Sequence, residues 1–149
     1  MELEVAKIED VKELSVLLNY LFQQETEFKP NKEAQNRGLS TIISNPEMGK
    51  ILIARESDKI IGMVNLLYTF STALGESVAI LEDMVVIPEV RNSGVGSKLL
   101  NYAIEFAKNN RCKRITLLTD EDNEKAHKFY KRNGFDRSSM IAFRRMKGL

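Results

Sequence analysis

The sequence predicts one domain of the mixed α+β class, with a mostly antiparallel sheet covered by helices. The 149 residues are enough for one hydrophobic core, and no linker, repeat or low-complexity tract divides them. Three strand patterns follow one another between residues 50 and 87, which favours antiparallel pairing. Beyond them a strand, a helix and a further strand alternate, and a unit of this kind is parallel and right-handed.

The first fifty residues are expected to form a strand and two helices. Residues 3–8 alternate between polar and apolar side chains, as a half-buried strand does. Asp10 and Glu13 have the spacing of a helix-opening capping pair, and leucines then recur at helical spacing as far as Leu21. A second helix is predicted over residues 31–44, after a polar loop that ends in a proline.

The middle of the chain is predicted to supply three consecutive strands. Residues 50–55 and 59–68 are separated by only three turn-forming residues, so they should form an antiparallel hairpin. A loop over residues 69–76 leads to a third long strand over residues 77–87. These three strands should form the centre of the sheet.

The C-terminal part is predicted to add two helices and the remaining strands. Residues 94–109 carry apolar side chains at helical spacing, residues 113–119 read as a strand, and residues 123–133 form a further helix. Phe135 and residues 140–146 are expected to supply closing strands. The complete prediction is a sheet of six to seven strands flanked by four helices.

Composition argues against several classes of function. The 22 Lys and Arg nearly balance the 21 Asp and Glu, which leaves no overall basic charge for holding nucleic acid. No apolar run approaches the roughly 20 residues that span a bilayer, and the first residues do not resemble a signal peptide. Cys112 is the single cysteine and there is one histidine, so neither a disulfide nor a metal site is expected. These features indicate a cytoplasmic protein without nucleic-acid or membrane partners.

One glycine-containing turn carries the strongest functional signal. An apolar strand stops at Pro88, and Arg91, Gly94 and Gly96 follow before a helix begins. Glycines there let backbone N–H groups approach a ligand, and a helix N-terminus adds partial positive charge, so the turn suits phosphate or pyrophosphate. The spacing fits neither the dinucleotide fingerprint nor the phosphate loop of nucleotide triphosphatases. For the glycine pair alone, a tight turn without a ligand is the alternative.

Two segments together resemble the GCN5-related N-acetyltransferases (GNAT). Arg91-x-x-Gly94-x-Gly96, preceded by Val-Ile-Pro, resembles the acetyl-CoA loop of that family. Downstream, residues 123–135 resemble its second signature, an Asn-x-x-Ala-x-x-Phe-Tyr helix that ends in Gly-Phe. The two signatures stand in the family's order, and the predicted elements match over nearly all of residues 1–149. The resemblance implies the GNAT fold, in which the third long strand splays from its parallel neighbour.

The resemblance also implies where acetyl-CoA binds. Its pantetheine would pair with the backbone of the splayed strand, and its pyrophosphate would take N–H groups from the turn. Asn123 matches a family contact to pantetheine, and its residue type also suits a helix N-cap. The implied cofactor-binding residues are Met84, Val85, Val86, Arg91, Asn92, Ser93, Gly94, Val95, Gly96, Ser97, Asn123, Ala126, Phe129 and Tyr130.

Two residues are candidates for catalysis. Moving an acetyl group from a thioester to an amine needs a neutral amine and a proton for the departing thiolate, without a covalent enzyme intermediate. Tyr130 matches the signature tyrosine that family members use as general acid; passive hydrogen bonding to the sulfur is the alternative. Glu82 is the candidate general base, because two carboxylates interrupt an apolar strand and resemble polyamine- and aminosugar-type members. Adjacent strand residues point to opposite faces, so only one of the pair is expected to face the acceptor. Asp83 is expected to be a structural carboxylate hydrogen-bonded at a bulge, and Asp83 or water is the alternative base.

The resemblance implies an N-acetyltransferase that moves an acetyl group from acetyl-CoA to a primary amine of a small molecule by direct attack in a ternary complex. A peptide or protein N-acetyltransferase and a non-catalytic acyl-CoA-binding regulatory module are the alternatives. A homodimer is a further expectation, because small family members often pair through C-terminal strands. Five acidic residues either line a site for a cationic amine or are scattered surface charge: Glu25, Glu27, Glu76, Glu82 and Asp83.

Overall fold

The strands of the sheet lie side by side in the order in which the chain forms them. The computed structural model describes residues 1–25 and 27–149. Across the sheet the order is β1 (Glu2–Val5), β2 (Gly49–Glu56), β3 (Lys59–Ser71), β4 (Glu76–Val86) and β5 (Ile115–Leu117). Pairing is antiparallel from β1 to β4, whereas β4 and β5 are parallel. The mixed α+β class and the parallel unit near the C-terminus are therefore confirmed.

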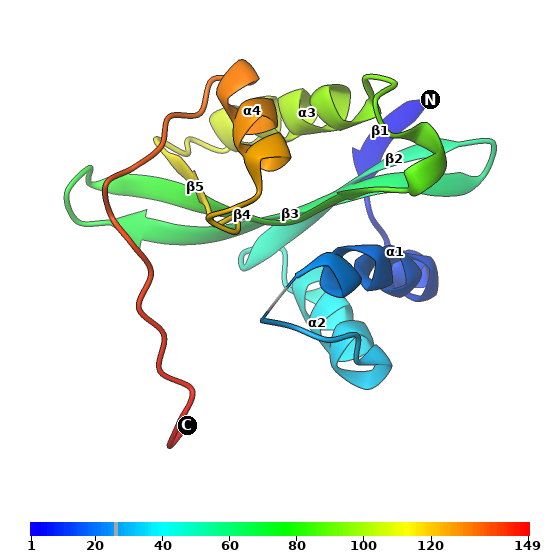
Figure 1. Cartoon of the computed structure of the whole chain (residues 1–149), viewed down its shortest axis with the longest axis horizontal. Helices are drawn as coiled ribbons and strands as arrows, with labels where there is room; N and C mark the ends of the chain where they lie inside the picture. The colour runs from blue at the N-terminus through cyan, green and yellow to red at the C-terminus, as the bar shows by residue number, and fades with distance from the viewer. Residues whose placement is uncertain (26) are drawn as a thin grey trace.

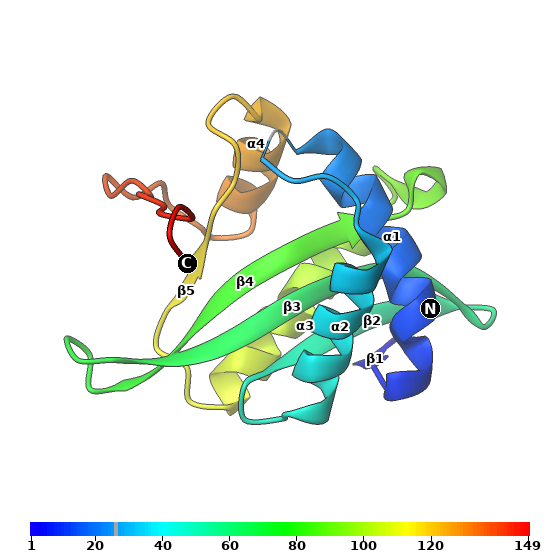
Figure 2. The ribbon, with the colours of Figure 1, turned by 90° about the horizontal axis from the view of Figure 1, so that it is seen from below.

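Two pairs of helices cover the two faces of the sheet (Figure 1). Helices α1 (Val11–Gln24) and α2 (Lys32–Ser44) lie on one face, and α3 (Val95–Asn109) and α4 (Glu124–Arg132) lie on the other. The four predicted helices are confirmed. The turned view separates the two layers, with α3 behind the strands and with α1 and α2 in front (Figure 2).

Alternate residues of the central strands face the two helical layers. Ile51 and Ile53 pack in a cluster with Leu14 of α1, and Leu52 between them packs in a second cluster with Leu99 of α3. This is the period of two expected of a strand that is buried on both faces. The sheet therefore separates one apolar core into two halves.

The strand bounds differ from the prediction at both ends of the chain. The first strand ends at Val5, because the chain turns into a short 3-10 helix, η1 (Ile8–Asp10). The six to seven strands expected are not found: the described residues form five, and neither Phe135 nor residues 140–146 form a strand. Alternating apolar residues form a strand only beside a partner edge, and the neighbouring β5 is just three residues long. The tail instead extends away from the sheet (Figure 1).

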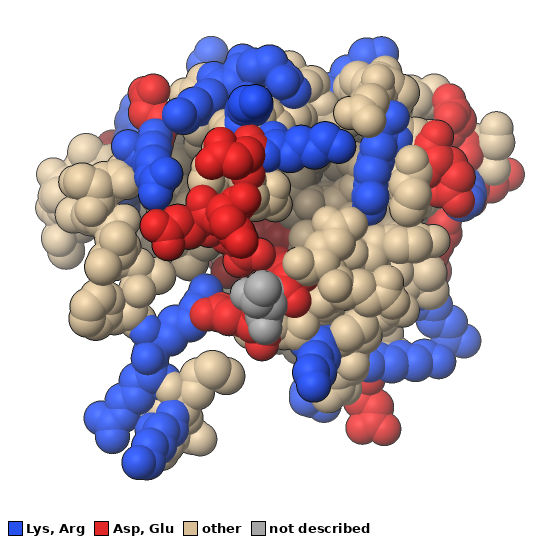
Figure 3. Space-filling model, in the orientation of Figure 1, with Lys and Arg blue, Asp and Glu red and all other residues tan. Residues whose placement is uncertain are grey.

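Charged side chains are distributed unevenly over the surface. On the face shown in Figure 3, acidic side chains gather in the middle, with Lys and Arg above them and along the C-terminal tail. The near-zero net charge of the sequence therefore hides a local acidic surface.

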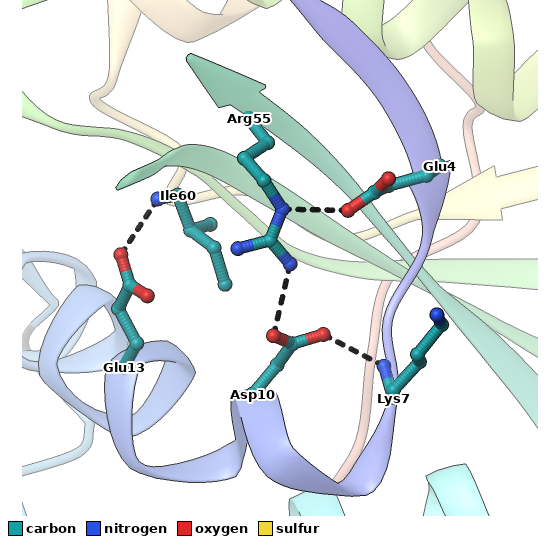
Figure 4. A network of polar contacts seen from close by, with 6 residues as sticks. All are labelled: Glu4, Lys7, Asp10, Glu13, Arg55 and Ile60. Carbon is teal, nitrogen blue, oxygen red and sulfur yellow. Dashed lines mark hydrogen bonds and ion pairs between the residues drawn. The ribbon is translucent and has the colours of Figure 1, made fainter. Parts of the chain in front are cut away.

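A polar network fastens the N-terminal segment to the sheet (Figure 4). Arg55 of β2 donates from Nε to Glu4 Oε1 at 2.6 Å and from Nη2 to Asp10 Oδ1 at 2.9 Å. Asp10 Oδ2 accepts from the backbone N–H of Lys7 at 2.8 Å, and Glu13 accepts a backbone N–H of β3 at 2.6 Å. The capping pair predicted at Asp10 and Glu13 is thus not formed, because both carboxylates have partners outside α1.

Candidate functional site

Strands β4 and β5 diverge beside the glycine-containing turn. They pair at three positions, the last of which joins Leu81 to Leu117, and β4 then continues to Val86 without a β5 partner. Figure 2 shows the two strands separating toward α4. Val85 and Val86 pair with β3 on their other side, and Met84 packs with the α3 half of the core. This is the splayed parallel pair that the resemblance implies.

The turn after β4 presents backbone N–H groups at the start of α3. The chain leaves β4 through the 3-10 helix η2 (Pro88–Val90), and Asn92 and Gly94 then adopt positive φ angles of 62° and 89°. Gly94 is the N-cap residue of α3, and without a side chain it leaves the first N–H groups of the helix uncapped. Arg91 donates from Nε to the carbonyl oxygen of Val86 at 3.2 Å, so its side chain folds back along the end of β4.

The first turn of α3 packs against the signature helix α4. Val95, Gly96 and Ser97 form this turn, and a Cβ atom on Gly96 would stand 3.5 Å from the ring of Phe129. Just before the turn, the hydroxyl of Ser93 donates to a backbone carbonyl of η2. The two sequence signatures, about thirty residues apart in the chain, therefore lie in contact.

The start of α4 is held by its own cap. The side chain of Asn123 accepts the N–H of Ala126 at 3.1 Å, so the N-cap interpretation of Asn123 is confirmed. His127 Nε2 lies 2.9 Å from the carbonyl oxygen of Asp120, which ties the helix to the loop that precedes it. The single histidine is thus placed in a structural contact.

Tyr130 stands between two aromatic rings. Its ring meets Phe129 edge-on at a centroid distance of 5.2 Å and Phe135 at 5.7 Å. Burial raises the pKa of the Tyr130 phenol to about 12, so the hydroxyl keeps its proton throughout the neutral pH range. The side chain is therefore fixed in place and able to donate a proton or a hydrogen bond.

A β-bulge interrupts β4 at the two carboxylates. The register with β3 shifts between Met63 and Asn65, and Asp83 has a φ of 54°. The extra residue changes the phase of the strand: Leu81 packs in the α3 half of the core, whereas Val85 packs in the α1 half. Without the bulge both would face the same side. The expectation that Asp83 lies at a bulge is confirmed.

The bulge places both carboxylates in one pocket. Glu82 and Asp83 line the same cavity of about 410 Å³ between β4 and the two N-terminal helices. The expectation that only one of the two faces this side is therefore wrong, because it assumed regular alternation of side chains. The sequence signal for the bulge was the pair of adjacent carboxylates itself.

Asp83 has the more strongly perturbed carboxyl group. Burial first, and then the negative charges of Glu82 and Glu25, raise its pKa to about 7; the hydrogen bond from Asn65 opposes this shift. Asn65 donates from Nδ2 to Asp83 Oδ2 at 2.5 Å. Glu82 is exposed at the pocket wall. Asp83 can therefore exchange a proton near neutral pH.

The pocket combines apolar walls with charged groups from three parts of the chain. Its carboxylates are those of Glu25, Glu82 and Asp83, and its cations are Lys29 and Arg144. Glu76, by contrast, begins β4 and does not line the pocket. The apolar lining includes Leu18, Phe22, Phe28, Leu39, Ile42 and Leu118. Two residues of the pocket lining, Asn65 and Arg144, were not predicted from the sequence. A polar residue within the apolar run of β3 was a signal for Asn65, and no sequence pattern indicated Arg144.

Within residues 1–25 and 27–149, no helix has the length and apolar character needed to cross a bilayer. The same residues contain no group of three or more His, Cys, Asp or Glu side chains arranged to hold a metal ion.

Comparisons with known proteins match this fold. A model of the acetyltransferase (GNAT) family matches residues 14–135. The chain is 27% identical over 137 residues to the aminoalkylphosphonate N-acetyltransferase of Salmonella typhimurium (strain LT2), a match covering 92% of this chain and 86% of that protein. It is also 40% identical over 86 residues to YhfO, an uncharacterized N-acetyltransferase of Bacillus subtilis (strain 168). This match covers 58% of this chain and 58% of YhfO. The last match thus spans less than two thirds of the Bacillus protein's length.

A solved structure shows the same arrangement over nearly the whole chain. A possible acetyltransferase from Clostridium difficile 630 superposes with a TM-score of 0.87 at 15% identity, covering 97% of this chain and 95% of that one. At this identity the likeness shows the fold alone. Since the family model covers most of the sequence, the chain belongs to the acetyltransferase (GNAT) family.

Proposed function

We propose that this protein transfers an acetyl group from acetyl-CoA to a primary amine of a small molecule, by direct attack within a ternary complex. The observation that carries the proposal is the position of the carboxylate-lined pocket. Glu82 and Asp83 line this pocket, and they follow directly after Leu81, the last residue of β4 that pairs with β5. An amine in the pocket and an acyl donor between the splayed strands would therefore meet at one strand.

The residues present fit the binding of acetyl-CoA. The uncapped N–H groups after Gly94 suit the pyrophosphate, and the backbone of Met84, Val85 and Val86 has a side without a β5 partner. Bound there, acetyl-CoA supplies a reactive thioester. Tyr130 is proposed to donate a proton to the departing sulfur, and its pKa of about 12 keeps the phenol protonated until the reaction. Asn92, Ser93, Asn123, Ala126 and Phe129 remain proposed cofactor contacts.

Asp83 is the better matched of the two proposed bases. An ammonium group must lose its proton before it attacks, and a carboxylate whose pKa lies near 7 accepts that proton more readily than an ordinary one. Glu82 shares the pocket and is proposed to hold the cationic amine or to pass the proton through water. The two roles are separated by the variants described in the Discussion.

A small acceptor is favoured over a peptide. The cavity of about 410 Å³ has the size of a small-molecule site, and the Salmonella relative is named for a small amine, an aminoalkylphosphonate. A peptide N-acetyltransferase is the alternative enzyme, and an acyl-CoA-binding regulatory module is the alternative without catalysis.

The release of CoA thiol in the presence of different amines tests the proposal. A panel of small primary amines and of peptides with free N-termini would be supplied with acetyl-CoA. We expect amine-dependent release of CoA and an acetylated small amine by mass spectrometry. Acetylation of peptides alone would favour the peptide enzyme. If no amine stimulates release while acetyl-CoA still binds, the regulatory module is favoured and the enzyme is rejected.

Gly94→Ala tests the proposed pyrophosphate site. Residue 94 has a φ of 89°, so a Cβ atom there costs about 1 kcal/mol and shifts the first N–H groups of α3. We expect the Kd for acetyl-CoA, measured by calorimetry, to rise about tenfold. Gly75→Ala is the matched control, because residue 75 also has a positive φ, 65°, and open space around it. An equal change in both variants would remove the turn from the binding site.

A homodimer in the cytoplasm remains a prediction. The dimer is supported by four apolar residues of the C-terminal tail that are 76–91% exposed: Met140, Ile141, Phe143 and Met146. Such side chains are usually covered by a partner. Light scattering is expected to give twice the 17.0 kDa mass of the chain; a monomer mass at all concentrations would contradict the dimer.

A further inference from the structure

The C-terminal tail places a guanidinium group in the acceptor pocket. Arg144 lines the pocket and its Nε lies 3.2 Å from Glu27 Oε2. The same guanidinium lies over the ring of Phe28, with its central carbon 5.9 Å from the ring centroid. A cation of this chain thus occupies the outer part of the pocket, held by a carboxylate and an aromatic face.

The carboxylates around this cation form a continuous group. Burial, followed by the negative charges of Asp120, Glu27 and Glu82, raises the pKa of Glu25, and the charge of Arg144 lowers it. The negative charges of Glu82 and Glu25 in turn raise the pKa of Asp83 at the inner end of the pocket. Negative charge therefore extends from the bulge of β4 to the loop after α1, and Figure 3 shows acidic side chains gathered beside the tail.

A buried amide at the inner end also has unused hydrogen-bonding capacity. Asn65 is 2% exposed and lines the pocket, and its Nδ2 is committed to Asp83. Among the described residues, its Oδ1 has no hydrogen-bond partner. A buried carbonyl oxygen of this kind is stabilised by an N–H donor, such as an ammonium group or a neutral amine in the pocket.

We infer that the acceptor is an amine with a second positive charge, whose reacting amine lies at Asp83 and Asn65 and whose second cation binds at Glu27 and Phe28. The inference rests on the proposed function and names the class of its acceptor. Arg144 occupies the position of the second cation when no acceptor is bound, so the tail competes with the substrate.

The tail arginine can leave this position at low cost. The side chains of Arg144 and Glu27 are 45% and 53% exposed, and ion pairs as exposed as this contribute little to stability. The residues around Arg144 form no strand. A small dication that also pairs with Asp83 inside the pocket makes contacts that Arg144 does not.

The competing arrangement is an amine that carries an anion. Lys29 also lines the pocket, and with Arg144 it would hold a phosphonate or carboxylate. The carboxylates favour the dication, because Glu25, Glu82 and Asp83 outnumber the two cations and Arg144 is itself already paired with Glu27. The two arrangements predict opposite effects when Arg144 is removed.

Kinetics of Arg144→Gln with three acceptors of similar length test the inference. Diaminobutane carries two cations, butylamine carries one, and aminopropylphosphonic acid carries a cation and an anion. We expect Arg144→Gln to lower the KM for diaminobutane by about threefold to tenfold and to leave the KM for butylamine within about twofold. Glu27→Gln should raise the KM for diaminobutane alone. Arg145→Gln is the matched control, because Arg145 donates to the carbonyl oxygen of Lys147 and does not line the pocket.

The outcomes separate the inference from the proposed function. Calorimetry of diaminobutane binding to the protein with CoA needs no turnover, so tighter binding to Arg144→Gln than to the native chain would support the subsite even if no amine is acetylated. A higher KM for aminopropylphosphonic acid in Arg144→Gln, with diaminobutane unchanged, would overturn the inference in favour of the anion. Equal effects of Arg144→Gln and Arg145→Gln would overturn it as well. If butylamine is acetylated, the proposed function is supported even when one of these two outcomes overturns the inference.

Discussion

Asp83→Asn is expected to lower kcat about a hundredfold and at the same time to stabilise the folded protein. The amide cannot take a proton from the amine, so catalysis loses its proposed base. Asparagine also tolerates the φ of 54° at this position, so the bulge should persist. Steady-state kinetics with the best acceptor of the panel measure the first effect.

The pH dependence of the native enzyme gives an independent readout. Asp83 must be ionised to act as a base. Below its pKa of about 7, kcat/KM should therefore fall tenfold more per pH unit than it does above that pKa. This change of slope should be absent in Asp83→Asn. If it persists there and disappears in Glu82→Gln, the base is Glu82, as the sequence alone suggested.

The gain in stability follows from the direction of the pKa shift. Burial raises the pKa of Asp83 from its ordinary value of 3.8 to about 7, so the folded protein binds a proton that the unfolded chain has released. The folded state therefore loses stability as the pH rises between these values, and carries the full penalty above about 7. Asp83→Asn should raise the free energy of unfolding by about 4 kcal/mol at pH 8, and by almost nothing near pH 4.

The hairpin turn between β2 and β3 offers a matched control for this substitution. Asp58 also has a positive φ, 64°, but it is exposed and lies outside the pocket. Asp58→Asn should leave kcat unchanged. If Asp83→Asn instead lowers the free energy of unfolding at pH 8, measured by denaturation, the buried charge of Asp83 does not destabilise the native protein.

Tyr130→Phe is expected to lower kcat by about tenfold to a hundredfold, with little effect on the Kd for acetyl-CoA. The substitution removes the proposed proton donor and keeps the ring between Phe129 and Phe135. Because burial raises the pKa of the phenol to about 12, no inflection from Tyr130 should appear in the pH profile between about 6 and 10. An unchanged kcat would exclude Tyr130 as the acid.

Tyr68→Phe is the matched control for the tyrosine. Burial likewise raises the pKa of Tyr68 to about 12, and its hydroxyl has no hydrogen-bond partner among the described residues. Tyr68 lines a separate cavity with Pro46 and Asn110. Equal loss of activity in both variants would indicate a general effect of removing a buried hydroxyl.

Local patterns were enough to predict the elements that bury a continuous apolar face. Apart from the bulge at Asp83, the strands and the helix α3 between residues 49 and 109 carry apolar side chains at strand or helix spacing, and the helix after Asn123 has a capping residue of the right type. The turn at Gly94 was predictable as well, since a positive φ next to a helix favours glycine. The closing strands were not found, because alternation within residues 140–146 says nothing about whether a partner edge is within reach.

The sequence by itself determined the family, the proposed cofactor turn and the proposed acid, because each depends on residues close together in the chain. Only the tertiary structure decided how the acceptor side is built. The bulge at Asp83 depends on the register with β3, and it brings both carboxylates to one pocket. Asn65, Glu27 and Arg144 come from distant parts of the chain. The strength of their interactions with other groups depends on distance and burial, which no local pattern encodes.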